Sequence, residues 1–109
     1  MTQQISAPWE SKRTNETRMV EDHLRKVFPG TDAYRFNSAS IRVRVIDERF
    51  RGKSFEERDT MVEPLLEELP EDTQRDIINL ITLYPGEAEE SIRARLVDLE
   101  FKDASSSLL

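Results

Sequence analysis

The 109-residue sequence predicts a single α+β domain, built as a small three-stranded sheet with helices packed on one of its faces. Residues 41–46 alternate apolar and basic side chains with the period of two that is typical of a strand. After a glycine turn, Ser54 and Glu57 form a capping-box pattern that predicts the start of a helix. Residues 77–84, IINLITLY, are apolar and β-branched almost throughout, which predicts a strand buried on both faces. The expected element order is α-β-β-α-α-β-α.

We expect residues 14–103 to form this domain. Residues 1–13 show no apolar periodicity, and we predict a disordered N-terminal tail. Residues 104–109 are rich in serine, and we predict a flexible C-terminal tail. Trp9 is the exception in the first tail, and it either docks onto the domain or lies in solvent.

The first helix and the first two strands follow from local patterns. Thr14 or Asn15 caps a helix that runs to about residue 28, because apolar side chains recur there at spacings of three and four. A Pro-Gly pair ends it. Residues 33–36 form a short strand, and the turn 37–40 joins it to the alternating strand as a hairpin.

Two prolines divide the chain between this hairpin and the last strand. The helix that begins at Ser54 carries an apolar stripe interrupted by Pro64, so we expect a kink near residues 60–61 or two helical pieces meeting there. Pro70 suits the first turn of a short further helix that ends at about Asp76.

The segment after Glu87 fits two structures. Residues 88–99 have the apolar spacing of a helix, whereas residues 97–102 alternate apolar and charged side chains like a strand. Acidic residues at the start of the segment favour a helix, because they lie near the positive end of its dipole. The structure of residues 95–103 is left open.

Composition excludes several classes of protein. The sequence contains no cysteine, so disulfides, thiolate metal sites and cysteine nucleophiles are excluded. No apolar run approaches the roughly 20 residues that a membrane-spanning helix needs, and the first residues lack the apolar core of a signal peptide. We therefore expect a cytoplasmic protein with no membrane partner.

No catalytic or cofactor-binding pattern is recognisable. His23 is the only histidine, and without a second histidine or a cysteine it cannot anchor a conventional transition-metal site. The segment Gly52-Lys53-Ser54 ends like a phosphate-binding loop, but Asp47 stands where that loop requires a glycine. Carboxylate pairs such as Glu63 and Glu67 lie opposite a leucine stripe, as expected of a solvated face. We predict a protein that is not an enzyme and has no metal and no cofactor.

Charge is distributed unevenly along a chain whose net charge is −6. Residues 54–76 are strongly acidic, whereas the strand and turn before them are basic. The basic side chains of that strip are Arg42, Arg44, Arg49, Arg51 and Lys53. We interpret them as a candidate contact surface for nucleic-acid phosphates or an acidic protein partner. The alternative is a solvent-facing strand edge whose charges discourage aggregation.

The sequence resembles the BolA-like family. The resemblance rests on VIDERFRGKSFEERDTMV, in which Val45 to Gly52, Ser54, Phe55, Arg58 and Val62 match the family pattern in spacing and type. Residues 20–30, VEDHLRKVFPG, resemble the family's first helix and its Pro-Gly exit, and residues 77–84 fall where the family has its last strand. The resemblance covers residues 16–84. It implies a fold similar to class II KH domains, roles in stress regulation, binding to monothiol glutaredoxins with a shared iron–sulfur cluster, and DNA binding in some members.

The chain departs from this family where metal ligands are expected. Asp59 and Thr60 stand in place of a histidine and an arginine, and Ile78 or Asn79 stands in place of the histidine near the last strand. The loop 37–40 contains no histidine or cysteine. We therefore expect iron–sulfur ligation to be lost, which weakens the case for a glutaredoxin partner. The Gly-x-x-Gly loop with which KH domains clamp RNA is also missing.

These observations predict a non-enzymatic, BolA-like binding or regulatory module that acts through protein–protein contacts. The alternative is a nucleic-acid-binding, KH-like stress regulator that uses the basic strip. The identity of the partner and the oligomeric state are left open.

Overall fold

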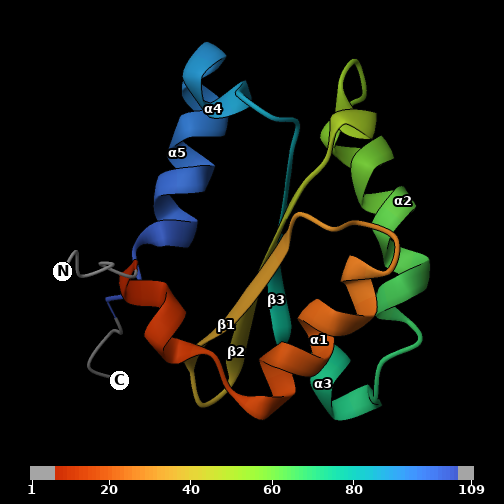
Figure 1. Cartoon of the computed structure of the whole chain (residues 1–109), viewed down its shortest axis with the longest axis vertical. Coiled ribbons are helices and arrows are strands. Elements are labelled where there is room, and N and C mark those ends of the chain that lie inside the picture. The colour runs from red at the N-terminus through yellow and green to blue at the C-terminus, as the bar shows by residue number, and fades with distance from the viewer. Residues whose placement is uncertain (1–6, 106–109) are drawn as a thin grey trace, which may run out of the picture.

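The computed structural model describes residues 7–105. Its elements, in chain order, are η1 (Pro8–Lys12), α1 (Asn15–Arg25), β1 (Thr31–Asn37), β2 (Ser40–Ile46), η2 (Glu48–Phe50), α2 (Phe55–Leu66), α3 (Glu71–Asp76), β3 (Ile77–Leu83), α4 (Glu87–Glu90) and α5 (Ile92–Lys102) (Figure 1). The two η elements are short 3-10 helices. The predicted α+β class and the three-stranded sheet are confirmed.

The sheet has the order β1-β2-β3, so β2 is its central strand. The predicted hairpin is confirmed, because β1 pairs with β2 antiparallel and aligns Ala33 with Val43. β3 lies parallel to β2 on the other side. The register between these two strands shifts at Ile78, which is an extra residue on β3 and therefore a β-bulge.

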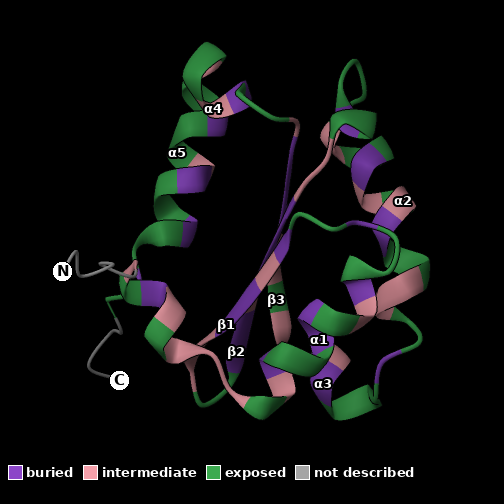
Figure 2. Ribbon diagram, in the orientation of Figure 1, coloured by how far each residue is buried: buried purple, intermediate pink, exposed green. Residues whose placement is uncertain are grey.

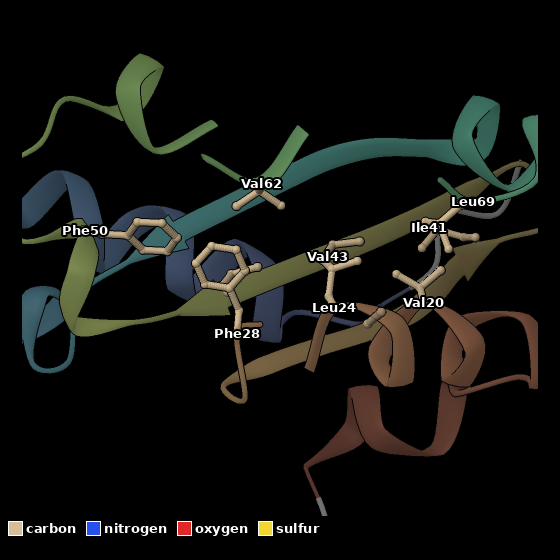
Figure 3. Packing of buried hydrophobic residues seen from close by; sticks show 10 residues of the cluster. Val20, Leu24, Phe28, Ile41, Val43, Phe50, Val62 and Leu69 are labelled. Atoms are coloured by element: carbon tan, nitrogen blue, oxygen red, sulfur yellow. The ribbon is translucent and has the colours of Figure 1, made fainter. Parts of the chain in front are cut away.

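Helices cover both faces of this sheet, whereas the sequence led us to expect them on one. Figure 1 shows α1, α2 and α3 on one side of the strands and α4 and α5 on the other. On the first face, Ile41 and Val43 of β2 pack against residues such as Val20, Phe28 and Phe50 (Figure 3). The second face has a core of its own, formed by Trp9, Tyr34, Ile81, Leu83, Ala94, Phe101 and Ala104. The elements η1 and α5 each carry apolar side chains. Those side chains are buried only when η1 and α5 pack on this second face of the sheet.

Capping residues set the starts of the main helices. Thr14 accepts a hydrogen bond from the Thr17 N–H and forms a capping box with it, and Ser54 does the same with Glu57, as predicted. Pro64 lies inside α2, which nevertheless runs from Phe55 to Leu66 as one helix. The expectation of two helical pieces is therefore wrong. Pro64 has no N–H to donate to the carbonyl of Thr60, so this one helical hydrogen bond is missing while the helix continues to Leu66.

The expected tails are shorter than predicted. Residues 8–12 form η1, and Trp9 within it is buried, so the prediction of a disordered tail up to residue 13 is wrong for these residues. The docked alternative for Trp9 is the one observed. At the other end α5 continues to Lys102, which resolves residues 95–102 as helix, and Ala104 is buried rather than part of a flexible tail. The parts of both predicted tails at 1–6 and 106–109 lie outside the described residues.

The two edges of the sheet are protected to different extents. At the β1 edge the buried Glu21 carboxylate accepts the Ala33 N–H at 2.9 Å, and the Arg25 side chain donates to the Thr31 carbonyl at 2.9 Å. At the β3 edge Arg58 donates to the Thr82 carbonyl at 2.9 Å. The start of β3 is more open, because Ile78 is exposed there. This departs from the expectation of a strand buried throughout, since β3 is an edge strand.

Candidate functional site

The five basic residues predicted as a contact surface do not lie on one surface. Arg42 and Arg44 project from the central strand toward the second face of the sheet, beneath η1 and α5, because they alternate with Ile41, Val43 and Val45 of the first face. The remaining three residues follow beyond the end of β2. The expected strip is therefore divided, and its strand half is covered by other elements.

Arg44 is the most enclosed of the five. Its Nη1 donates to Asp98 at 2.8 Å and its Nη2 to Asp32 at 3.0 Å, and the guanidinium lies 4.6 Å from the centre of the Phe101 ring. The side chain of Asp32 also accepts from Arg13 at 3.2 Å. Arg44 therefore links β1, β2 and α5 and is not available to an external phosphate.

Arg42 fixes the end of α5. Its Nη1 donates to the carbonyls of Glu100 at 2.8 Å and Asp103 at 3.0 Å, and to the Tyr34 hydroxyl oxygen at 3.0 Å. Its guanidinium also lies 3.8 Å from the centre of the Phe36 ring. Tyr34 in turn donates to the Phe101 carbonyl at 2.6 Å, so both side chains hold the helix against the sheet.

The other three basic residues are exposed, but two of them are neutralised locally. Arg49 pairs with Asp47 at 2.8 Å, and Arg51 pairs with Glu48. Lys53 is exposed, and its ammonium makes no ion pair with any residue in the range 7–105. The exposed part of the strip therefore presents little positive charge that is not already paired with an acidic side chain. The sequence could have indicated this, because Asp47 and Glu48 lie two and three residues before the arginines with which they pair.

Asp98 makes the second face sensitive to acid. Burial alone would raise the pKa of its carboxyl, but hydrogen bonds from Lys102 and Arg44, together with their charges, outweigh burial and hold that pKa below its ordinary value. A carboxyl whose pKa is lower in the folded than in the unfolded state stabilises the fold above the unfolded pKa, and this contribution is lost as the pH falls through the folded pKa.

We therefore expect the free energy of unfolding to fall as the pH drops below about 4, the ordinary pKa of an aspartate. Replacing Asp98 with asparagine should reduce this pH dependence. Urea denaturation of both proteins, from about pH 6 to about pH 3, measures it. Equal pH slopes for the two proteins would contradict the assignment.

The side chains that could bind a metal ion or act in catalysis are far apart. Within residues 7–105 no three histidine or acidic side chains gather closely enough to hold a metal ion. His23 contacts Glu68 at 3.0 Å on the surface. Asp59 and Asn79 line one groove beside the β3 edge. In the alignment with the BolA-like pattern, Asp59 stands at one histidine position, and Asn79 is one of the two candidates, with Ile78, for the other. No helix in the described part of the chain is long and apolar enough to cross a bilayer.

The outer face of α5 is the surface that sequence reasoning missed. Ile92, Leu96 and Leu99 are 75%, 61% and 54% exposed, and their spacing of four and three residues places them in a row. The row points away from the sheet, since the helical spacing places the buried residues Ala94 and Phe101 on the opposite side of α5. Figure 2 shows exposed segments on the side of α5 that faces away from the strands. We call Ile92, Leu96 and Leu99 the outer row. Their helical spacing is visible in the sequence, but the same spacing is typical of a buried stripe.

A groove adjoins the outer row. It has a volume of about 350 Å³ and lies between α5 and the end of the sheet, with Ile46, Leu83 and Leu99 among its apolar walls. Arg95 and Lys102 also line it. Glu89 and Asp98 line it as well, and Lys102 pairs with Asp98 at 2.9 Å. The outer row and this groove together form a surface with an apolar centre and a flank of mixed charge.

Comparison of the chain with protein-family models, with curated proteins and with solved structures finds no match.

Proposed function

We propose that this chain is a non-catalytic, BolA-like protein-binding module of the cytoplasm, and that the outer row of α5 is its contact surface. The observation that carries the proposal is the exposure of three large aliphatic side chains in one row on a helix whose other side is fully packed. Apolar side chains scattered singly over a surface are ordinary, whereas a contiguous apolar patch is typical of an interaction site. The element order, which agrees with the one that the BolA-like resemblance implies, supports the family part of the proposal.

The flank of the outer row indicates the chemistry of the partner. Arg95 lies one helical turn from Leu99, on the side of the adjoining groove. Lys102 pairs with Asp98, whereas Arg95 forms no ion pair with another residue between 7 and 105. An amphipathic partner segment with one acidic residue placed to reach Arg95, beside its apolar residues, is complementary to this arrangement. A second copy of the chain is less suitable, because antiparallel pairing of two α5 helices across Leu96 brings each Arg95 close to its copy. The net charge of −6 also opposes self-association.

The nucleic-acid alternative finds less support. Affinity for phosphates requires lysines and arginines that can approach the backbone, and Arg42 and Arg44 are engaged inside the second face. Charge reversal of the exposed Lys53 and Arg51 would test what remains of this alternative.

The test substitutes one member of the outer row. In a pull-down from native cell extract, Leu96→Glu should lose a partner that the unaltered chain captures, and nuclease treatment should leave the capture intact. Val27→Glu is the matched control, because Val27 is an exposed aliphatic residue outside α5. Both substitutions are on the surface, so each should change the free energy of unfolding by no more than about 0.5 kcal/mol.

Two results would contradict the proposal. One is capture that Leu96→Glu and Val27→Glu leave equally intact. The other is capture that disappears with nuclease treatment and with reversal of Lys53 and Arg51, which would favour the nucleic-acid alternative.

A further inference from the structure

We infer that the open edge of β3 binds an extended, basic segment of a partner protein by strand addition, with one lysine or arginine side chain inserted between Asp59 and Glu100. This site is separate from the outer row of α5, and the inference does not depend on the proposed function.

The first step concerns the backbone of β3. Leu83 accepts the Asp47 N–H on the side of β2, whereas the Thr82 carbonyl accepts from Arg58 on the outer side. Backbone groups of successive residues in a strand point to opposite edges, so those of Leu80 also point outward. An edge strand with unpaired N–H and C=O groups is a template for a further strand.

The second step is the contrast between the two edges. The β1 edge is closed by Glu21 and Arg25, which bond to its backbone from α1. The β3 edge is closed at Thr82 only, and toward its start the side chain of Ile78 is 67% exposed. The part of the β3 edge before Thr82 is therefore the more open of the two to a further strand.

The third step is the groove beside this edge. Residues 79–82 form its floor, α2 contributes Phe55 and Asp59, and α5 contributes Val97, Glu100 and Arg93. Arg93 lies over the Phe55 ring at 4.6 Å, a contact between the two helices. The groove measures about 200 Å³, below the roughly 300 Å³ at which sites for whole small molecules begin. It suits a single long side chain presented by a strand beside β3.

The fourth step is charge. Neither Asp59 nor Glu100 forms an ion pair with another residue between 7 and 105. Burial raises the pKa of Asp59, and the nearby Glu63 and Glu56 raise it further, as expected of a carboxyl in an acidic environment. A lysine or arginine would neutralise this environment, and its aliphatic stem would pack against Phe55, Leu80 and Val97. A phosphate backbone would be repelled by the same carboxylates.

The experiment is an NMR titration of the full chain with two capped seven-residue peptides. Both alternate valine and threonine, and the central residue is lysine in one and glutamate in the other. The lysine peptide should shift the amide signals of Leu80 and Thr82 with a saturating dependence on concentration. The glutamate peptide should bind at least about tenfold more weakly, as expected when a charged hydrogen-bonding partner is lost.

Charge-removing variants distinguish the groove from the acidic helix surfaces of the chain. Asp59→Asn combined with Glu100→Gln should weaken binding of the lysine peptide about tenfold or more. Glu67→Gln combined with Glu89→Gln removes the same charge elsewhere and should leave binding unchanged, as should Leu96→Glu on the outer row.

Three results would overturn the inference directly, and a fourth would move the peptide to another surface. The three are equal binding of the two peptides, equal weakening by the two charge-removing double variants, and shifts confined to acidic helix surfaces with none at Leu80. Loss of peptide binding in Leu96→Glu would place the peptide on the outer row instead. Because the two surfaces are tested by different variants, either proposal can fail without the other.

Discussion

Replacing Glu87 with alanine is expected to lower the free energy of unfolding by about 3–5 kcal/mol, the cost of leaving a buried charge without its partner. Glu87 and Arg58 are 7% and 4% exposed, and they form a two-pronged ion pair with distances of 2.7 and 3.0 Å. The same carboxylate accepts the Tyr84 N–H at 3.1 Å. In the variant the guanidinium would keep its bonds to the carbonyls of Thr82 and Lys53 but would lose its counter-charge.

Urea denaturation, followed by circular dichroism, measures this change. Glu89→Ala is the matched control, because Glu89 lies in the same short helix and is exposed. It should alter stability by no more than about 0.5 kcal/mol. The double variant Glu87→Leu with Arg58→Met should recover much of the loss, since apolar replacement of both members of a buried pair is often close to neutral. A loss below about 1 kcal/mol in Glu87→Ala would show that water reaches the guanidinium in solution.

The parts of the fold that could be predicted from the sequence are those that neighbouring residues determine. Ser54 and Glu57 lie three residues apart, and their capping box needs nothing from the rest of the chain. The hairpin of β1 and β2 follows from a short turn between two apolar segments.

Coverage of the sheet could not be predicted in the same way, because it depends on residues that are distant in sequence. Arg42 and Arg44 alternate with apolar residues, and this alternation alone indicates a solvated face. Their actual partners are Asp98 and the carbonyls of Glu100 and Asp103, more than fifty residues later in the chain. For this reason Arg42 and Arg44 bind to α5 and do not share a surface with Arg49, Arg51 and Lys53. An arginine beside buried aromatic rings and an arginine in water give the same sequence pattern.

Trp9 is the clearest case of a residue whose burial depends on contacts that are distant in sequence, and its contribution to stability can be measured. Nothing around it in the sequence predicts a core position, yet it is 5% exposed and packs against Phe101 and Tyr34, with ring centres 5.3 and 5.9 Å away. Arg13 and Arg44 lie over its ring at 4.7 and 5.6 Å. Trp9→Ala is therefore expected to reduce the free energy of unfolding by about 3–5 kcal/mol, as for other buried large aromatic side chains.

Because Trp9 is the only tryptophan in the chain, its own fluorescence reports whether η1 is docked. Acrylamide should quench it weakly in the native protein and strongly in urea. The fluorescence and circular dichroism transitions should also coincide, as they do when one cooperative unit unfolds. Ser11→Ala, an exposed substitution in the same short helix, should leave both transitions in place. A fluorescence change at lower urea than the loss of helix would show that η1 detaches before the domain unfolds. In that case the second face would be only loosely covered, and Arg44 could become accessible to a ligand without unfolding of the sheet.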